Sequence, residues 1–298
     1  LEFSEQIAKV GVQPILGCNI KIKTPKEYLH ENIEDNDLYF YLNIFSKSNE
    51  GYENLLKCVS NAYTFNKGNA YVTVEDLTKL KDGLIILSGG NNSILTHSTG
   101  HMITNQSQQF ISDFKKEFND NFYIEIQRFG SVDYRLNEEA VLNLAYDHHI
   151  PLVATNDAYF EGPEHFEAHD ALMCIEKKLF VSQSDRTRLS KEHYFKTQNE
   201  MLEQFHDLPE ALNNTIEIAQ RCVHRPKIKN PILPVYDDDQ NKEKELMQKL
   251  AKDGLDDRLN AKFDIENIDI EQQNEIRKAY EERLFKELKI IINMKYEG

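Results

Sequence analysis

Five short apolar stretches in the first half of the chain predict β-strands. Residues 122–127 alternate between apolar side chains on one face and Tyr123, Glu125 and Gln127 on the other, which is the period-2 pattern of a strand. Three of the other stretches are nearly continuous apolar runs, as expected for strands buried on both faces of a parallel sheet. The predicted strands are residues 12–20, 39–46, 84–87, 122–127 and 152–155.

Helical periodicity fills the intervals between these strands. Residues 51–62, 110–118 and 137–146 each place apolar side chains three or four positions apart, which predicts amphipathic helices. Because strands and helices alternate, we expect βα units, and therefore either an α/β barrel or a doubly wound sheet.

Beyond residue 160 the pattern is helical, without further strands. Thr197-x-x-Glu200 and Asp207-x-x-Glu210 each predict a capping box, in which a side-chain oxygen accepts a free N–H and an acid three residues later bonds back. Each motif therefore predicts the start of a helix.

Three prolines mark the best domain boundary. Pro226, Pro231 and Pro234 interrupt the helical pattern, since proline lacks an N–H and breaks helices. Two highly charged helical segments follow, at residues 242–262 and 271–294. The predicted parts of the chain are residues 1–225, a Pro-rich linker at 226–240 and a helical segment at 241–298.

Charge and composition limit the classes of function. The 35 Lys and Arg against 50 Asp and Glu give a net charge of −15, which disfavours direct binding to nucleic-acid phosphates. No apolar run is long enough to span a membrane. Four scattered cysteines without CxxC spacing argue against a zinc finger and suit buried thiols in a reducing cytoplasm, where we expect the protein. The chain starts without Met or a signal peptide, and we expect a fragment or trimmed product.

Two acidic positions are candidates for chemistry. Asp157 directly follows the last predicted strand, where a barrel places its active-site mouth; it is a metal ligand or base there, or an Asp that caps the next turn. His169 and Asp170 follow, and they form either an acid–base pair or a structural polar contact.

Other polar clusters favour plain structural roles. His97 and His101 have i, i+4 spacing but no carboxylate partner of the HExxH kind, so a surface pair is expected. His148 and His149 sit at a predicted helix end, where cationic side chains are common. The run 237–239 of three aspartates is expected to be a solvated linker. P-loop, GxGxxG, GxSxG and HxH motifs do not occur.

Seven segments, taken in order, resemble the PHP domain of bacterial replicative DNA polymerase III alpha subunits (family C). Each segment alone is a weak signal, whereas the ordered set spans nearly the whole chain. The segments are GVQPILGC (11–18), NEGYENL (49–55), LSGG (87–90), FYIEIQ (122–127), PLVATND (151–157), FEAHDAL (166–172) and LPEALNNT (208–215).

The resemblance implies an architecture and a parent activity. It implies a PHP-type distorted, TIM-like βα barrel that lacks its N-terminal HxH strand and is followed by the helical beginning of the palm. The parent would transfer nucleotides with Mg²⁺, and its catalytic aspartates would lie beyond Gly298. In this fragment, His169 and Asp170 would be remnants of the barrel-mouth site.

The resemblance also implies that the metal site is degenerate. The family's glutamate of the GxE motif falls on Asn19, two histidines fall on Tyr41 and Tyr159, and a cysteine falls on Gly90. Among these positions, only Asp157 retains the type of residue that ligates metal in the family. Since one carboxylate cannot hold a cluster of ions, no metal or other cofactor is expected in the fragment.

By the same resemblance, the barrel would support the rest of the alpha subunit and dock the proofreading exonuclease subunit. DNA would be contacted through other domains, and the sliding clamp through absent C-terminal regions. Two alternatives stay open: a stand-alone PHP metal-dependent phosphoesterase, and a binding module without a polymerase parent.

Overall fold

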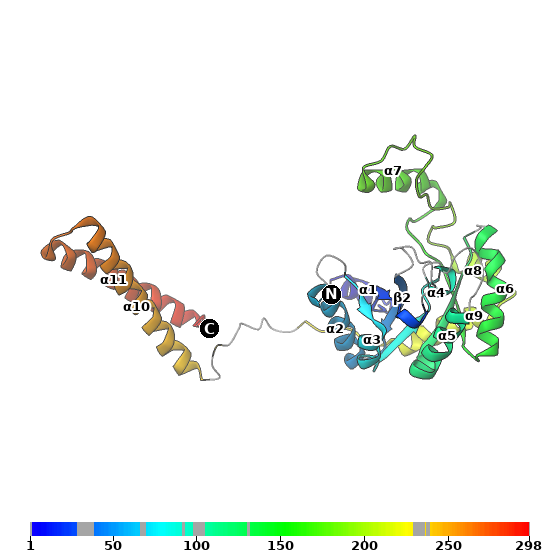
Figure 1. Cartoon of the computed structure of the whole chain (residues 1–298), viewed down its shortest axis with the longest axis horizontal. Coiled ribbons are helices and arrows are strands. Elements are labelled where there is room, and N and C mark those ends of the chain that lie inside the picture. Colours follow the sequence, from blue (N-terminus) through cyan, green and yellow to red (C-terminus); the bar gives the residue numbers. More distant parts are fainter. Residues whose placement is uncertain are drawn as a thin grey trace. The chain divides into compact units, whose positions relative to one another are not determined.

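The computed structural model describes residues 2–28, 39–65, 70–90, 93–97, 105–129, 132–228, 236 and 239–297. The chain forms two compact units, unit 1 (Leu1–Lys227) and unit 2 (Ile228–Gly298), whose elements are labelled in Figure 1. Over the described residues, no helix combines the length and the apolar character needed to cross a bilayer.

A six-stranded sheet forms the centre of unit 1, in the order β3-β1-β2-β4-β5-β6. β4, β5 and β6 are parallel to one another, whereas β2 is antiparallel to both β1 and β4. The α/β class is therefore confirmed, and the closure of the sheet into a barrel stays a prediction. The strands are β1 (Gly17–Lys23), β2 (Tyr39–Ser46), β3 (Val72–Thr73), β4 (Leu84–Leu87), β5 (Phe122–Gln127) and β6 (Leu152–Thr155).

Nine helices accompany this sheet over the described part of unit 1, besides short 3-10 turns. They are α1 (Glu2–Lys9), α2 (Asn49–Phe65), α3 (Val74–Lys79), α4 (Ile94–His97), α5 (Asn105–Phe118), α6 (Val132–Asp147), α7 (Phe166–Lys177), α8 (Gln198–Gln204) and α9 (Pro209–Arg221). The three predicted helices of the first half are confirmed as α2, α5 and α6, each extended by a few residues.

Four of the five predicted strands have the predicted bounds, and the first does not. The prediction of residues 12–20 is wrong because β1 begins only at Gly17 and continues to Lys23. Pro14 cannot donate to a sheet ladder. The Gln13 side chain instead donates to the carbonyls of Ala219 and Cys222, at 2.6 and 3.0 Å. The preceding stretch is thus held at the end of α9.

The predicted parallel arrangement is wrong for β2. This strand alternates strictly between half-buried and buried side chains, which is typical of an antiparallel strand covered on one face. β4 and β5, by contrast, are buried at every position. Residues 72–73, which form β3, are too few to give a sequence signal.

The sheet has an apolar core on each face. Side chains such as Ile22, Leu42 and Ile124 pack in the larger cluster with α2, α5 and α6. On the second face, a smaller cluster includes Tyr123 and Ile218 of α9. Each fully buried Leu, Ile or Phe stabilises the fold by about 1.5–3 kcal/mol.

One of the two predicted capping boxes is confirmed. Thr197 caps α8, and its side chain and that of Glu200 bond each other's backbone N–H groups. The box at Asp207 is wrong, because α9 begins at Pro209 after Leu208 without a side-chain cap. The Asp207 carboxylate instead pairs with Arg128 at 2.7 Å.

A segment of residues 158–196, here called the α7 arm, leaves the sheet after β6 and returns to it (Figure 1). Its base is a two-stranded contact in which the N–H of Tyr159 donates to the carbonyl of His193 and that of Phe195 donates to Phe160, both at 2.9 Å. These two bonds join the ends of the arm to each other, and the Ser190 hydroxyl donates to the carbonyl of Phe129, just after β5, at 3.1 Å.

Unit 2 is a helical hairpin of α10 (Gln240–Glu266) and α11 (Ile270–Met294). Asn267 ends α10 in the left-handed conformation, and Asp269 caps the start of α11. Leu259 and Phe263 of α10 are buried, whereas Leu250 of the same helix is 60% exposed. The predicted Pro-rich linker lies mostly outside the described residues, so its boundaries stay predictions.

Gly51 and Gly254 offer a matched test of the packing in the two units. A Cβ on Gly51 would come within 1.9 Å of the Gly83 carbonyl oxygen, whereas one on Gly254 in α10 meets nothing within 4 Å. We predict that Gly51→Ala lowers the free energy of unfolding of unit 1 by about 1–3 kcal/mol. Gly254→Ala should raise that of unit 2 by about 1 kcal/mol. Urea unfolding measures both, and a neutral Gly51→Ala would contradict the close contact.

Candidate functional site

Polar side chains from several strands meet at the carboxylate of Glu125, near the end of β5. Glu125 is 4% exposed. The carboxyl ends of the parallel strands β4, β5 and β6 lie along one edge of the sheet, which is where α/β folds place their sites. This edge is therefore the candidate site.

Four neutral groups donate hydrogen bonds to the Glu125 carboxylate. The Asn43 side-chain amide reaches both oxygens, at 3.2 and 2.9 Å, and the N–H of Gly89 reaches Oε2 at 3.2 Å. The Gln127 amide and the Thr155 hydroxyl both donate to Oε1, at 3.1 and 2.5 Å. We call these five residues, together with Asn19, the Glu125 network.

The Glu125 network runs across the sheet from β1 to β6. The Asn19 amide donates to Oδ1 of Asn43 at 2.8 Å, and the Gln127 amide also donates to the Thr155 hydroxyl at 3.1 Å. The Glu125 N–H donates to Ser88 Oγ at 3.0 Å. These bonds connect the antiparallel strands β1 and β2 to the parallel strands β5 and β6.

Glu125 is a buried acid without a cationic hydrogen-bond partner among the described residues. Burial raises its pKa, although hydrogen bonds from Thr155, Asn43 and Gly89 act in the opposite direction, and the charge of Asp157 raises it further. A buried carboxylate is costly unless it is well bonded, and bonds to an ionised acceptor are stronger than neutral ones. The network supplies that bonding.

Asp157 and Tyr159 lie beside this network, after β6. Burial raises the pKa of the Tyr159 phenol, and the nearby charge of Asp157 and a hydrogen bond to Asp157 raise it further.

His193 is a buried histidine at the base of the α7 arm. Its ring stacks on that of Phe129, with the ring centroids 4.2 Å apart. Its Nδ1 lies 2.9 Å from Ser190 Oγ, and burial lowers its pKa.

The structure brings most of the sequence-predicted positions to this edge. Gly90 has a positive φ of 54°, and a Cβ there would lie 2.1 Å from Oε1 of Gln127. The Gln127 side chain thus fills the space next to Gly90. The backbone carbonyl of Tyr41 lies beside Gly89, where it leaves no room for a Cβ. Asn19 joins the network itself.

His169 and Asp170 belong to the α7 arm. Asp170 is 2% exposed, and Arg186 binds both of its oxygens, at 2.5 and 2.6 Å. Arg186 and then Arg188 lower the pKa of Asp170. The His169 ring lies 5.6 Å from that of Tyr159. Asp170 therefore makes the structural contact that the sequence left open, and a remnant role for either residue stays a prediction.

The structure tests only some of the remaining candidates. His101, Asp237 and Asp238 lie outside the described residues, and His97 ends α4. Asp239 caps α10 by accepting a bond from the N–H of Asn241 at 3.0 Å.

Sequence reasoning missed the centre of the site. Glu125, Asn43, Gln127, Thr155 and His193 were not singled out, although the polar face of residues 122–127 was recognised. A usable signal is the presence of Glu and Gln within a strand that is otherwise apolar. Such polar side chains require partners when the strand is buried.

The donor set does not fit a resident transition-metal ion. In the part of the chain that the structure describes, no group of three or more His, Cys, Asp and Glu side chains could hold a metal. Zinc sites use His, Cys and carboxylate ligands at about 2.0–2.3 Å. The amides of Asn43 and Gln127 instead direct their N–H groups at Glu125, so their orientation suits an anion.

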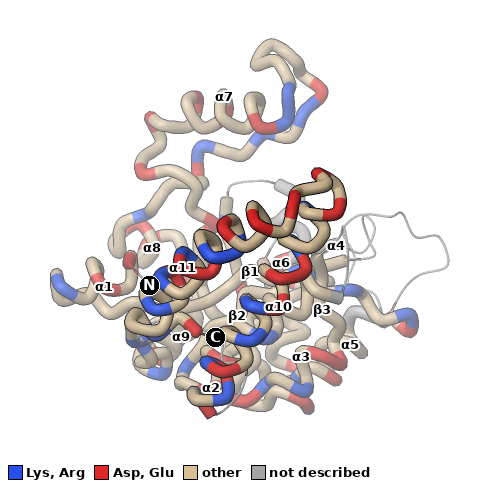
Figure 2. Tube along the Cα trace, turned by 90° about the vertical axis from the view of Figure 1, so that its left-hand side faces the viewer, with Lys and Arg blue, Asp and Glu red and all other residues tan. Residues whose placement is uncertain are grey.

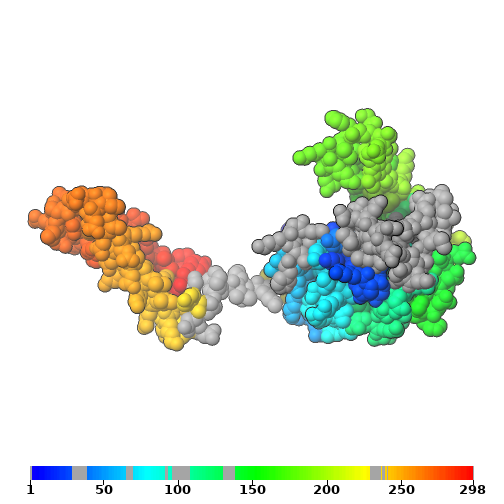
Figure 3. Space-filling view, in the orientation of Figure 1, coloured from blue at the N-terminus to red at the C-terminus, as the bar shows by residue number. Residues whose placement is uncertain are grey.

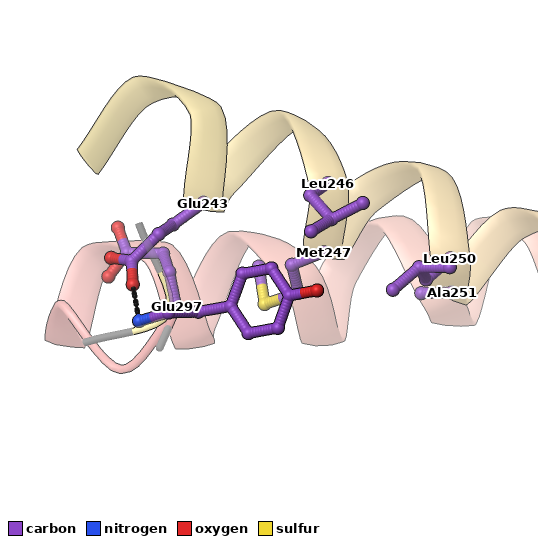
Figure 4. Close-up of a pocket in the computed structure, with 7 residues that line it drawn as sticks. Glu243, Leu246, Met247, Leu250, Ala251 and Glu297 are labelled. Carbon is purple, nitrogen blue, oxygen red and sulfur yellow. Dashed lines mark hydrogen bonds between the residues drawn. The ribbon is translucent and has the colours of Figure 1, made fainter. Parts of the chain in front are cut away.

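A separate hollow of about 490 Å³ lies in unit 2 and is mainly apolar. Leu246, Met247, Leu250 and Ala251 line it, while Glu243 bonds the Tyr236 N–H at one end (Figure 4). It offers no nucleophile paired with a base, so the site remains at the edge of the sheet in unit 1.

Comparison with known families identifies the class of domain. Residues 1–129 match the model of the PHP domain. The expected resemblance to PHP domains is thereby confirmed, and this stretch contains β1 to β5 together with most of the Glu125 network.

The whole chain is similar to DNA polymerase III subunit alpha from several bacteria. It is 34% identical over 300 residues to that of Rickettsia bellii and 35% identical over 305 residues to that of Caulobacter vibrioides, with 100% of this chain and 25% of each relative covered. It is 30% identical over 291 residues to that of Escherichia coli, which covers 97% of this chain and 24% of the relative. The chain thus spans about a quarter of the length of these curated relatives.

The raised pKa of Glu125 makes a pH-dependent prediction for Glu125→Gln. An acid whose pKa is raised by folding stabilises the fold below its ordinary pKa, and this contribution is lost as the pH rises through the folded pKa. The unfolding free energy of the wild type minus that of the variant should therefore fall from about pH 4.5 upward, with a slope of at most about 1.4 kcal/mol per pH unit.

Urea unfolding between pH 4.5 and 8 measures this difference. Glu75→Gln, which removes an exposed carboxylate paired with Lys79, is the control and should change stability by less than about 1 kcal/mol at every pH. A difference for Glu125→Gln that is flat or rises with pH would contradict the assignment.

Proposed function

We propose that the chain is part of the alpha subunit of a bacterial replicative DNA polymerase, in which the PHP domain supports the polymerase without metal chemistry of its own. The observation that carries this proposal is the Glu125 network. Hydrogen bonds between neutral groups and one carboxylate occupy the edge of the sheet where a metallated PHP domain would hold its ions.

Side-chain chemistry at the edge supports this role. Asn19, Tyr41, Gly90 and Tyr159 stand at four positions where the family resemblance places metal ligands. Neither a tyrosine ring nor a glycine replaces an imidazole or a thiolate. Of the family's ligand positions considered, only that of Asp157 still carries a metal-binding type of side chain. Among the described residues, the edge is suited to holding strands together and has no set of ligands that could activate a water molecule.

The parent activity we propose is template-directed nucleotidyl transfer with Mg²⁺, carried out by catalytic aspartates in a part of the polypeptide not included in this chain. Residues 241–298 would begin the palm, after a PHP domain at 1–225 and a linker at 226–240. DNA would be held mainly by other domains. In support, the net charge is −15, and acidic and basic positions are interspersed along the helices (Figure 2).

Further partners follow from the same proposal. The PHP domain would support the remaining alpha subunit and dock the proofreading exonuclease subunit, with the sliding clamp bound through C-terminal regions. The complex would act in the cytoplasm.

Metal content distinguishes this proposal from a stand-alone PHP phosphoesterase. We predict that the chain, purified without chelators, holds only substoichiometric Zn, Mn and Fe by plasma mass spectrometry. It should not hydrolyse bis(p-nitrophenyl) phosphate above background with added Mn²⁺ or Zn²⁺. Several tightly held ions per chain, together with hydrolysis, would favour the phosphoesterase.

Restoring a thiol provides a second test. We predict that Gly90→Cys lowers the free energy of unfolding by about 1–3 kcal/mol, because the added side chain overlaps that of Gln127, and that it gains no stoichiometric zinc. Gly90→Ala is the control for the steric effect, and adding Gln127→Ala should recover part of the loss. A stable Gly90→Cys that binds one equivalent of zinc would show a site already arranged for metal.

A further inference from the structure

Two cationic side chains meet on one neutral oxygen at the other edge of the sheet, where β4 and β5 begin. Lys47 directly follows β2, and its Nζ donates to Oδ1 of Asn121, the residue before β5, at 2.8 Å. The guanidinium of Arg221, at the end of α9, donates to the same Oδ1 at 2.5 Å. We call Lys47, Asn121 and Arg221 the Lys47 cluster.

The two cations of the Lys47 cluster differ in their other partners. Arg221 also donates to the Tyr123 hydroxyl at 2.7 Å and pairs with the Glu217 carboxylate at 3.4 Å. The Lys47 ammonium, by contrast, makes no ion pair with a described residue, and its hydrogen-bond acceptor is the amide oxygen of Asn121. The positive charge of Lys47 is therefore held by a neutral acceptor, next to a second positive charge.

This environment favours the neutral amine of Lys47. Burial lowers the pKa of its ammonium, and the charge of Arg221 lowers it further, while Cys222 and the exposed Asp82 act in the opposite direction. Loss of one proton removes the repulsion from Arg221, and the remaining N–H groups can still donate to Asn121. Neutral lysine amines with a cationic neighbour are the form that proteins use as nucleophiles.

Small reagents have access to this part of unit 1. Lys47 is only half-buried, so part of its side chain is in contact with solvent. The α7 arm leaves the sheet from the opposite edge, after β6, and stands away from the body of unit 1 in Figure 3. The Arg221 guanidinium would attract a reagent that carries a phosphate group, because guanidinium binds phosphate oxygens well.

We propose that Lys47 is a site of acylation by an acyl phosphate, a small molecule in which an acyl group is joined to phosphate. The neutral Nζ attacks the carbonyl carbon, and a carbon–nitrogen amide bond forms. The bond between that carbon and the phosphate oxygen breaks, and its electron pair leaves with the phosphate. The proton lost from the nitrogen ends on the released phosphate. The product is a neutral amide, so Arg221 becomes the only cation of the Lys47 cluster.

Peptide mapping by mass spectrometry, after incubation with acetyl phosphate near neutral pH, tests this inference on the 298-residue chain. Lys79 is the internal control, because it is exposed and bonds the Glu75 carboxylate at 2.7 Å, which raises its pKa. We expect Lys47 to be acetylated at least about fivefold faster than Lys79. In concentrated urea, where both environments are lost, the two rates should agree within about twofold.

Asn121→Asp tests the physical cause of this reactivity. The variant places a carboxylate of the same size where both cations already bind, so the pKa of Lys47 should rise. Its acetylation should then slow at least about fivefold, while that of Lys79 stays unchanged. Asn260→Asp is the matched control, because it makes the same change at an asparagine that binds Arg277 in unit 2; it should leave both rates unchanged.

Two results would overturn the inference. The first is acetylation of Lys47 in the folded wild type that is no faster than that of Lys79. The second is a rate at Lys47 that a folded Asn121→Asp variant leaves unchanged. The wild-type comparison decides the matter by itself if circular dichroism shows that the variant does not fold.

Discussion

The buried carboxylate of Glu125 imposes the condition that the rest of this sheet edge has to satisfy. A carboxyl group with 4% exposure must be well bonded when it is ionised, or else be neutral. Here Asn43, Gly89, Gln127 and Thr155 all donate to it. Because these donors come from β2, the turn after β4, and β5 and β6, satisfying one carboxylate also fixes the ends of neighbouring strands.

This arrangement gives a physical basis for the supporting role that we propose for this edge. A metal ion would connect strand ends through several His, Cys and carboxylate ligands, whereas the network connects them through amides and a hydroxyl. Gly90 and Gln127 illustrate how hydrogen-bonding groups stand where a metal ligand would be needed. The side-chain amide of Gln127 fills the space that a side chain at Gly90 would occupy. The α7 arm starts at residue 158, directly after Asp157 and three residues after β6 ends at Thr155.

Local patterns predicted most elements of this fold, and long-range contacts determined the rest. The bounds of β2, β4, β5 and β6 followed from apolar runs. The start of β1 did not, because it depends on Gln13 bonding to α9, more than 200 positions away. The antiparallel direction of β2 is likewise not a local property. Glu125 could not be predicted from local spacing, because its partner Asn43 lies 82 positions away in the sequence.

Thermal unfolding with and without metal tests the central claim most directly. A ligand that binds only the folded state raises the unfolding temperature by mass action. The account predicts the same unfolding temperature for unit 1 in excess EDTA and in excess Zn²⁺, Mn²⁺ or Mg²⁺. A rise with any of these ions that Asp157→Asn or Glu125→Gln abolishes would contradict it, since the edge of the sheet would then hold metal.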